Sequence, residues 1–140
     1  MNEKYMKYAL QEALKAYNKQ EIPVGAVIID NNNKIIAKSH NNRQKKHKIT
    51  GHAEINCILK AEKKTKDWRL DNCVMYVTLE PCEMCKLIIK ESRIEHVFYL
   101  LKKNNEKTMK NTNFLQTNDC ENIKKEYKLI LESFFNNLRD

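Results

Sequence analysis

The sequence predicts an α/β fold, with helices packed on a mixed central sheet, in a single domain over residues 1–140. The first reason is the order of the periodic segments, which runs helix, hairpin, helix, strand, helix, strand. The second is the length, because 140 residues suffice for one hydrophobic core and no internal repeat or linker divides the chain. In sheets of this kind, sites commonly lie where strand ends meet the starts of helices.

The first third of the chain predicts a helix and a hairpin. Residues 3–19 carry apolar side chains at helical spacing, which indicates an amphipathic helix. Residues 22–29 are rich in β-branched side chains and lead into the turn sequence Asp30-Asn31-Asn32-Asn33. A second strand over 34–39 completes the hairpin, and both strands are expected to be substantially buried. Residues 40–51 follow neither period and predict a loop.

The rest of the chain alternates between helices and strands. A helix over 52–64 is expected to turn Ile55, Ile58 and Leu59 toward the core. The later predicted elements are a strand over 74–79, a helix over 82–91, a strand over 95–101 and an amphipathic helix over 123–138. The aromatic residues of that last helix are expected to pack in the core. Residues 102–113 show no clear pattern.

Two short stretches carry metal-binding side chains, His52-Ala53-Glu54 and Pro81-Cys82-Glu83-Met84-Cys85. Together they read H-x-E and P-C-x-x-C, a pattern typical of zinc-dependent base deaminases. Two thiolates and one imidazole give three ligands, and catalytic zinc sites keep the fourth position for water. We therefore predict one Zn²⁺ per subunit, held by His52, Cys82 and Cys85, with Glu54 moving protons as the catalytic residue.

The spacing of these residues restricts where they can lie. Residues two apart point to nearly opposite sides in the middle of a helix, so His52 and Glu54 can converge only at a helix start. Cys82 and Cys85, three apart, are neighbours on one helical face. Pro81 suits the start of a helix, and the helix dipole there favours thiolates. The sequence thus predicts two helix N-termini facing one zinc ion.

The C-x-x-C pair has two other possible uses. It could form half of a zinc finger or a thioredoxin-like redox pair. No second C-x-x-C or H-x₃₋₅-H pair completes a four-ligand structural site, and a redox pair leaves His52 and Glu54 unexplained. A non-catalytic zinc or RNA-binding module remains a third class, but a purely structural site has no use for a general base at Glu54.

The predicted loop before His52 is strongly basic, in a chain of net charge +8. Its cationic side chains are candidates for RNA phosphate contacts, namely Arg43, Lys45, Lys46 and Lys48. A plain solvated loop is the competing interpretation, since lysine is common throughout the chain. Asn41 is a candidate for hydrogen bonds to a base or ribose, although asparagine in a loop is usually turn chemistry.

Composition points to a cytoplasmic protein. The five cysteines are an odd number with two in the motif, which fits a reducing cytosol better than a disulfide framework. Cys57, Cys73 and Cys120 are expected to be core or surface thiols. No apolar run reaches ~18 residues, so no membrane span is expected. The N-terminus has no apolar signal core, and we expect no export segment.

These residues resemble the cytidine deaminase superfamily and, within it, the bacterial tRNA-specific adenosine deaminases. The resembling segments are Glu21–Val27, His40–Arg43, Gly51–Ile55, Val77–Cys85, Ser92–Ile94 and Phe134–Arg139. The resemblance implies the cytidine-deaminase-like three-layer fold. It also implies a homodimer whose second subunit contributes to the tRNA-binding surface.

The resemblance further implies hydrolytic deamination of adenosine to inosine at the wobble position of tRNA. In the family, zinc-bound hydroxide attacks C6 of adenine, and the residue at Glu54 carries the proton from water to the ring nitrogen. The anticodon-loop base must be splayed into the pocket. By resemblance, the substrate-binding residues are Asn41, Val24, Leu79 and Pro81.

Three stretches depart from the family pattern. Lys86-Leu87-Ile88 replaces the small residues usual after the second cysteine, residues 100–105 lack the expected glycine, and Gly51 stands where alanine is more usual. Lys86-Leu87-Ile88 suits a small-molecule deaminase equally well. The alternative substrate is therefore a free nucleobase or nucleotide such as guanine, cytosine or dCMP.

Overall fold

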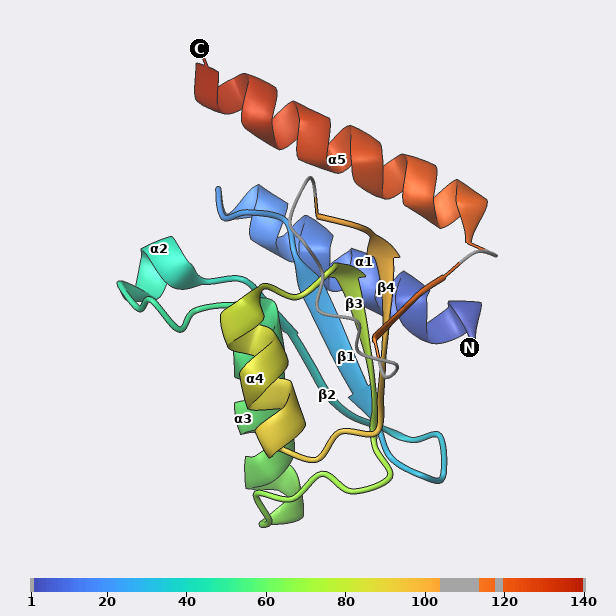
Figure 1. The fold of residues 1–140 in the computed structure, drawn as a ribbon. Helices are drawn as coiled ribbons and strands as arrows, with labels where there is room; N and C mark the ends of the chain where they lie inside the picture. The colour runs from blue at the N-terminus through green and yellow to red at the C-terminus, as the bar shows by residue number, and fades with distance from the viewer. Residues whose placement is uncertain (1, 104–113, 118–119, 140) are drawn as a thin grey trace.

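The structure is a computed structural model that describes residues 2–103, 114–117 and 120–139. Helices cover both faces of one sheet, which gives three layers (Figure 1). The helices are α1 (Glu3–Asn18), α2 (Arg43–Lys46), α3 (Ala53–Thr65), α4 (Glu83–Glu91) and α5 (Glu121–Arg139). The strands are β1 (Gly25–Ile29), β2 (Ile35–His40), β3 (Val74–Leu79), β4 (His96–Leu101) and β5 (Phe114–Gln116).

The sheet is mixed, as the sequence predicts. Its strand order is β2-β1-β3-β4-β5. Strand β1 is antiparallel to both β2 and β3, whereas β3, β4 and β5 run parallel to one another. The parallel step from β3 to β4 needs a crossover, and α4 supplies it. As a result, the carboxyl end of β3 leads directly into the second metal-binding motif.

The hairpin strand β1 lies between two cores, because successive strand side chains point to opposite faces. Ala26 and Ile28 pack with α3 and α4, while Val27 and Ile29 pack with α1 and α5. All five residues of β1 are buried, which is why its sequence is continuously apolar rather than alternating. This strand is therefore the central support of the three layers.

Gly25 begins β1 at the point where α1 comes closest to the sheet. A Cβ atom here would collide with the carbonyl oxygen of Ala9 and would lie 2.5 Å from the amide nitrogen of Ala13. Only glycine permits this approach without moving the helix backbone. The close packing fixes the segment just before β1, which includes Val24.

The structure corrects three boundary or orientation predictions. The segment 40–51, predicted as a loop, contains the short helix α2. The first strand starts at Gly25 rather than at Ile22. The prediction for Leu59 is wrong, because this side chain is 59% exposed.

The orientation of α3 explains the error at Leu59. Ala53, Cys57 and Ala61, spaced four residues apart, are all 0% exposed, so they define the inward stripe together with Ile55 and Ile58. The small side chains let α3 lie close to the sheet, and that rotation turns Leu59 outward. Cys73 and Cys120 are also buried, as thiols of the core are expected to be.

The region after β4 is only partly described. Of the pattern-free stretch 102–113, residues 104–113 lie outside the described residues. The short strand β5 was not predicted, because three residues are too few to show a period of two. Within the described parts of the chain, we find no helix with the length and apolar character needed to cross a membrane.

Candidate metal centre and active site

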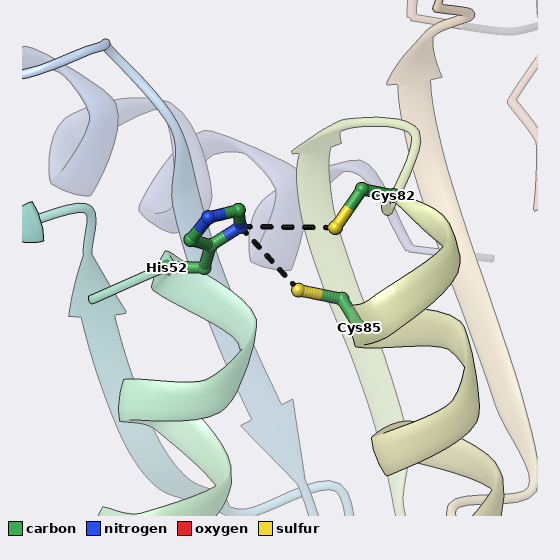
Figure 2. A group of neighbouring side chains, drawn as sticks. All are labelled: His52, Cys82 and Cys85. Carbon is green, nitrogen blue, oxygen red and sulfur yellow. Dashed lines mark hydrogen bonds between the residues drawn. The ribbon is translucent and has the colours of Figure 1, made fainter. Parts of the chain in front are cut away.

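The three predicted metal ligands come from the starts of two helices that face each other (Figure 2). His52 is the N-cap residue of α3, and Cys82 is the N-cap residue of α4. Both adopt extended backbone conformations, and neither caps its helix with a side-chain hydrogen bond. Cys85 lies in the first turn of α4 and is 0% exposed. The side chains therefore point at one another instead of satisfying the helix ends.

The separations between these atoms fit a zinc ion. Nδ1 of His52 lies 3.8 Å from Sγ of Cys82 and 3.5 Å from Sγ of Cys85. All three candidate ligand atoms lie within 4.8 Å of one another. Tetrahedral zinc, with Zn–S of about 2.3 Å and Zn–N of about 2.0 Å, places nitrogen and sulfur ligands about 3.6 Å apart. The donor set and its spacing thus suit a zinc ion with one position left for a further ligand.

The electrostatics of the two cysteines differ sharply. Hydrogen bonds from Cys85 and His52 lower the pKa of the Cys82 thiol to about 3. The neighbouring Cys82 and burial raise the pKa of Cys85, so without metal this pair holds one thiolate and one thiol. The bond to Cys82 also raises the pKa of His52. A cation entering the site therefore meets a preformed thiolate.

Glu54 lies in the first turn of α3, beside the candidate ligands, and is only 4% exposed. Burial raises the pKa of its carboxyl group above the ordinary value. A carboxylate whose pKa moves toward neutrality is a better proton carrier, because it can both accept and release a proton near neutral pH. It was predicted as the catalytic residue, and its position at the metal-facing end of α3 suits that role.

A cavity of about 260 Å³ opens onto these groups. His52, Glu54 and Cys82 form its floor, and the described residues around them form its wall. Three predicted substrate-binding residues line it: Asn41, Val24 and Leu79. Pro81 is buried in the turn between two lining residues and is not itself part of the lining. The volume is at the small end of ligand sites, which suits a single nucleoside better than a large ligand.

The predicted RNA-contact residues spread from the cavity to the outside. Arg43 lines the cavity, whereas Lys45 and Lys46 border a second hollow of about 410 Å³ on the other side of α2. Lys48 is exposed just beyond the helix. Lys19 and Lys60 also border the second hollow, so positive charge continues away from the cavity along one side of the molecule.

Several lining residues were not predicted. Ile22, Glu80, Lys103 and Phe135 all reach the cavity. Phe135, 47% exposed, comes from α5, whose aromatic residues were expected to serve only the core. Ile22, Glu80 and Phe135 lie in segments that resemble the family, and that resemblance is the signal the sequence offers for them. Nothing in the local pattern marks Lys103.

The atypical residue Lys86 is buried and paired. Its Nζ lies 3.3 Å from Oε2 of Glu80, and both side chains are 3% exposed. The other oxygen of Glu80 accepts a hydrogen bond from the backbone N–H of Lys103 at 3.2 Å. Among the described residues that line the cavity, neither Lys86 nor Leu87 nor Ile88 occurs. Lys86 thus supports Glu80 in the cavity wall and does not itself line the cavity.

Residues 1–101 match the family described as the cytidine and deoxycytidylate deaminase zinc-binding region. The tRNA-specific adenosine deaminase of Bacillus subtilis is 45% identical to this chain over 98 residues, which make up 70% of this chain and 60% of that relative. The chain also spans less than two thirds of further bacterial relatives with the same name.

Two solved structures at 29% identity share the fold. One comes from studies of A-to-I editing by tRNA:A34 deaminases at the wobble position of transfer RNA; its TM-score is 0.73, over 81% of this chain and 97% of that one. The other is a guanine deaminase from Bacillus subtilis, with a TM-score of 0.69 over 92% of this chain and 94% of that one. These similarities confirm the expected cytidine-deaminase-like three-layer fold.

The thiol chemistry gives a direct test of the metal centre. In metal-free protein, Cys82 should be the first cysteine alkylated by iodoacetamide, because its low pKa makes it a thiolate while Cys57 and Cys73 are buried and have raised pKa values. Its alkylation rate should stay nearly flat between about pH 5 and 8, whereas an ordinary thiol gains about tenfold per pH unit. Peptide mass mapping measures both.

Stoichiometric Zn²⁺ should protect Cys82 and Cys85 together. The variant Cys82→Ala serves as the control, because it should leave only slow thiols. Rapid labelling of Cys57 before Cys82, or no protection by zinc, would contradict this assignment of the ligands.

Proposed function

The chain belongs to the cytidine and deoxycytidylate deaminase family, and from that premise we propose that it is a zinc-dependent hydrolase that converts adenosine to inosine at position 34 of tRNA, the wobble position. The observation that carries the proposal is the convergence of His52, Cys82 and Cys85 beside the buried carboxyl of Glu54, next to a cavity that His52, Glu54 and Cys82 line. The relatives named tRNA-specific adenosine deaminases support adenosine in tRNA as the substrate.

The cofactor is one Zn²⁺ per subunit, held by His52, Cys82 and Cys85. When bound, zinc would lower the pKa of a water molecule to about 7 and so supply a nucleophile at neutral pH. The other tasks belong to the chain. Glu54 accepts one proton from water and delivers it to the ring nitrogen next to C6. It then takes the second proton from the hydroxyl group now on C6 and gives it to the amine, which leaves as ammonia. The overall balance is adenosine plus water giving inosine plus ammonia.

The cavity wall orients the nucleoside and limits the access of water. Val24 is buried and Leu79 partly buried, and both are apolar, so they offer surfaces for the faces of a purine ring. Asn41, 6% exposed in the same wall, supplies the directional polar group for the base or ribose. Pro81 shapes the turn that carries Cys82. On this basis we assign Val24, Leu79 and Asn41 to substrate contact, and Pro81 to positioning of the turn beside them.

The tRNA partner engages through its anticodon loop. A wobble base that is splayed out of the loop can enter a nucleoside-sized cavity, while the flanking backbone stays outside. Arg43 at the cavity, with Lys45, Lys46 and Lys48 next to it, places cationic groups where that backbone passes. The net charge of +8 gives the long-range attraction that RNA binding requires.

We further infer a homodimer that works in the cytoplasm. Leu59 on α3 and Leu87 on α4 are 59% and 56% exposed, on two helices that pack side by side (Figure 1). Large exposed apolar side chains on neighbouring helices are typical of an association surface. Four buried cysteines and a reactive thiolate at Cys82 suit a reducing compartment.

A small-molecule deaminase is the second candidate, since the Bacillus subtilis guanine deaminase shares the fold over nearly the whole of both chains. Salt separates the two activities. Binding of tRNA through several phosphates weakens steeply as salt rises, whereas a free base or nucleotide shows little dependence.

The deciding experiment incubates the purified protein with deproteinised total tRNA and then sequences for inosine. Inosine at the first anticodon position, with kcat/KM falling steeply between about 50 and 200 mM salt, is the expected result. Ammonia release from guanine or a free nucleotide, with no inosine in tRNA, would replace the proposal with the second candidate.

The role of Glu54 is tested separately by Glu54→Gln. The amide keeps the shape of the side chain but cannot carry the proton, so kcat should fall by about 10²- to 10⁴-fold while one zinc per chain remains. Zinc is measured by plasma emission and turnover by inosine formation. Cys82→Ala, which removes a ligand, should instead lose both zinc and activity. Full turnover in Glu54→Gln, or loss of its zinc, would show that Glu54 has another role.

A further inference from the structure

The helix α2 is unusual because little of it is held by packing. It has four residues, none of them buried, and three carry positive charge: Arg43, Lys45 and Lys46. Its N-cap residue, Asn42, makes no side-chain cap hydrogen bond. A short exposed helix of like charges is unstable by itself, because nucleation is costly and the cations repel one another. Contacts with other segments must therefore hold it in place.

The first such contact comes from Glu21, in the segment between α1 and β1. Its Oε1 accepts a hydrogen bond from the backbone N–H of Gln44 at 3.0 Å, and its Oε2 accepts one from Lys45 at 2.8 Å. The residue is only 2% exposed. Both oxygens of one buried carboxylate are thus engaged by consecutive N–H groups that the helix itself leaves unpaired. The negative charge also lies among cationic side chains that it offsets.

Three further contacts join the loop to the active site. The amide oxygen of Asn41 accepts the backbone N–H of Arg43 at 3.3 Å, so a predicted substrate-binding residue supports the start of α2. The side chain of Asn56 on α3 donates to Oδ1 of Asn42 at 2.8 Å. The backbone N–H of Asn42 donates to the carbonyl of Gly51 at 2.9 Å. These contacts hold the loop that contains α2 against the start of α3 and beside Asn41.

Gly51 also helps to hold α2 in place, because it lies against the backbone of Arg43. A Cβ atom at this position would lie 2.5 Å from Cα of Arg43 and 2.7 Å from its nitrogen. The close approach explains why this chain has glycine here, since a side chain would collide with the backbone of Arg43. It brings the backbone of Arg43 next to the residue that precedes His52. The position of α2 is thereby linked to the start of α3.

We propose that Glu21 is a positioning residue for RNA binding, which fixes α2 and thereby places Asn41 and Arg43 at the mouth of the cavity. This inference rests on the proposed function, because it assigns the loop to a tRNA substrate. Glu21 itself does not touch the substrate, since both of its carboxylate oxygens are engaged by the chain. Its neighbour Ile22 lines the cavity, so the same segment supports two parts of the site.

The test compares Glu21→Gln with Glu95→Gln in the full-length zinc-loaded protein. Each substitution raises the net charge by one unit, which by itself does not weaken RNA binding. Only Glu21→Gln removes the acceptor of two backbone N–H groups and sets an NH₂ group against one of them, whereas among the described residues Glu95 pairs only with the exposed side chain of His96, at 3.5 Å. Glu95, at the start of β4, is 53% exposed in its side chain and has no role in the loop. The pair therefore separates positioning from simple charge.

We expect KM for tRNA to rise about tenfold in Glu21→Gln, since hydrogen bonds to a charged group are lost. Its kcat should change by less than about twofold, and zinc content should stay at one per chain. Amide hydrogen exchange at Gln44 and Lys45 should accelerate in this variant, and Glu95→Gln should match the wild type in every measurement. Glu21→Asp, which keeps the charge but is too short to reach both N–H groups, should behave like Glu21→Gln.

Unchanged exchange at Gln44 and Lys45, or an unchanged KM, would overturn the inference. Equal losses in kcat, zinc and thermal midpoint would also overturn it, because they would indicate a general structural role. Inosine formation by the wild type reports on the proposed function. The exchange rates and the difference between the two Glu→Gln variants report on Glu21, so the two ideas can fail separately.

Discussion

The whole site depends on two helix starts meeting at one point. His52 and Cys82 occupy equivalent N-cap positions on α3 and α4, and Cys85 follows one turn into α4. Anionic ligands are stabilised there by the N-terminal ends of the helix dipoles. A zinc ion held by these three side chains would keep one coordination position open, which is what separates a catalytic zinc site from a structural one.

The surrounding fold holds the starts of α3 and α4 next to each other. Both follow segments at one end of the sheet: β2 leads through the α2 loop into α3, and β3 leads through Glu80 into α4. The C-terminal helix adds a further support, since the hydroxyl of the fully buried Tyr127 donates to the carbonyl of Pro23 at 2.8 Å. The hydroxyl oxygen of Thr78 accepts a hydrogen bond from the backbone N–H of Gly25 at 3.2 Å, next to Val24 of the cavity wall. Buried polar bonds of this kind fix one arrangement, because breaking one leaves an unsatisfied group.

The Lys86–Glu80 ion pair likewise fixes the turn before Cys82 in one arrangement. Burying two charges costs free energy, so such a pair adds specificity of geometry rather than much net stability. It ties the first turn of α4 to the turn that carries Pro81 and, through Lys103, to the end of β4. Lys86 therefore supports the cavity wall through Glu80 without lining the cavity itself.

Much of this could be predicted from the sequence, because the decisive information is local. Residue type and three-residue spacing identify the ligands, and the 3.6- and 2-residue periods identify most helices and strands. The helix α2 could not be predicted, since its N–H groups are satisfied by Glu21, 23 residues away for Gln44. The exposure of Leu59 depends on how closely the small residues of α3 approach the sheet. Phe135 and Glu80 reach the cavity only through tertiary packing.

The most direct test of the central claim is X-ray absorption spectroscopy of the zinc-loaded protein at the zinc edge. The account predicts two sulfur ligands at about 2.3 Å and two nitrogen or oxygen ligands at about 2.0 Å, one of them exchangeable. Replacement of the exchangeable ligand by added azide or cyanide should change the spectrum while both sulfur distances stay the same. Three or four sulfur ligands, or a spectrum that no added ligand changes, would indicate a closed structural site and contradict the account.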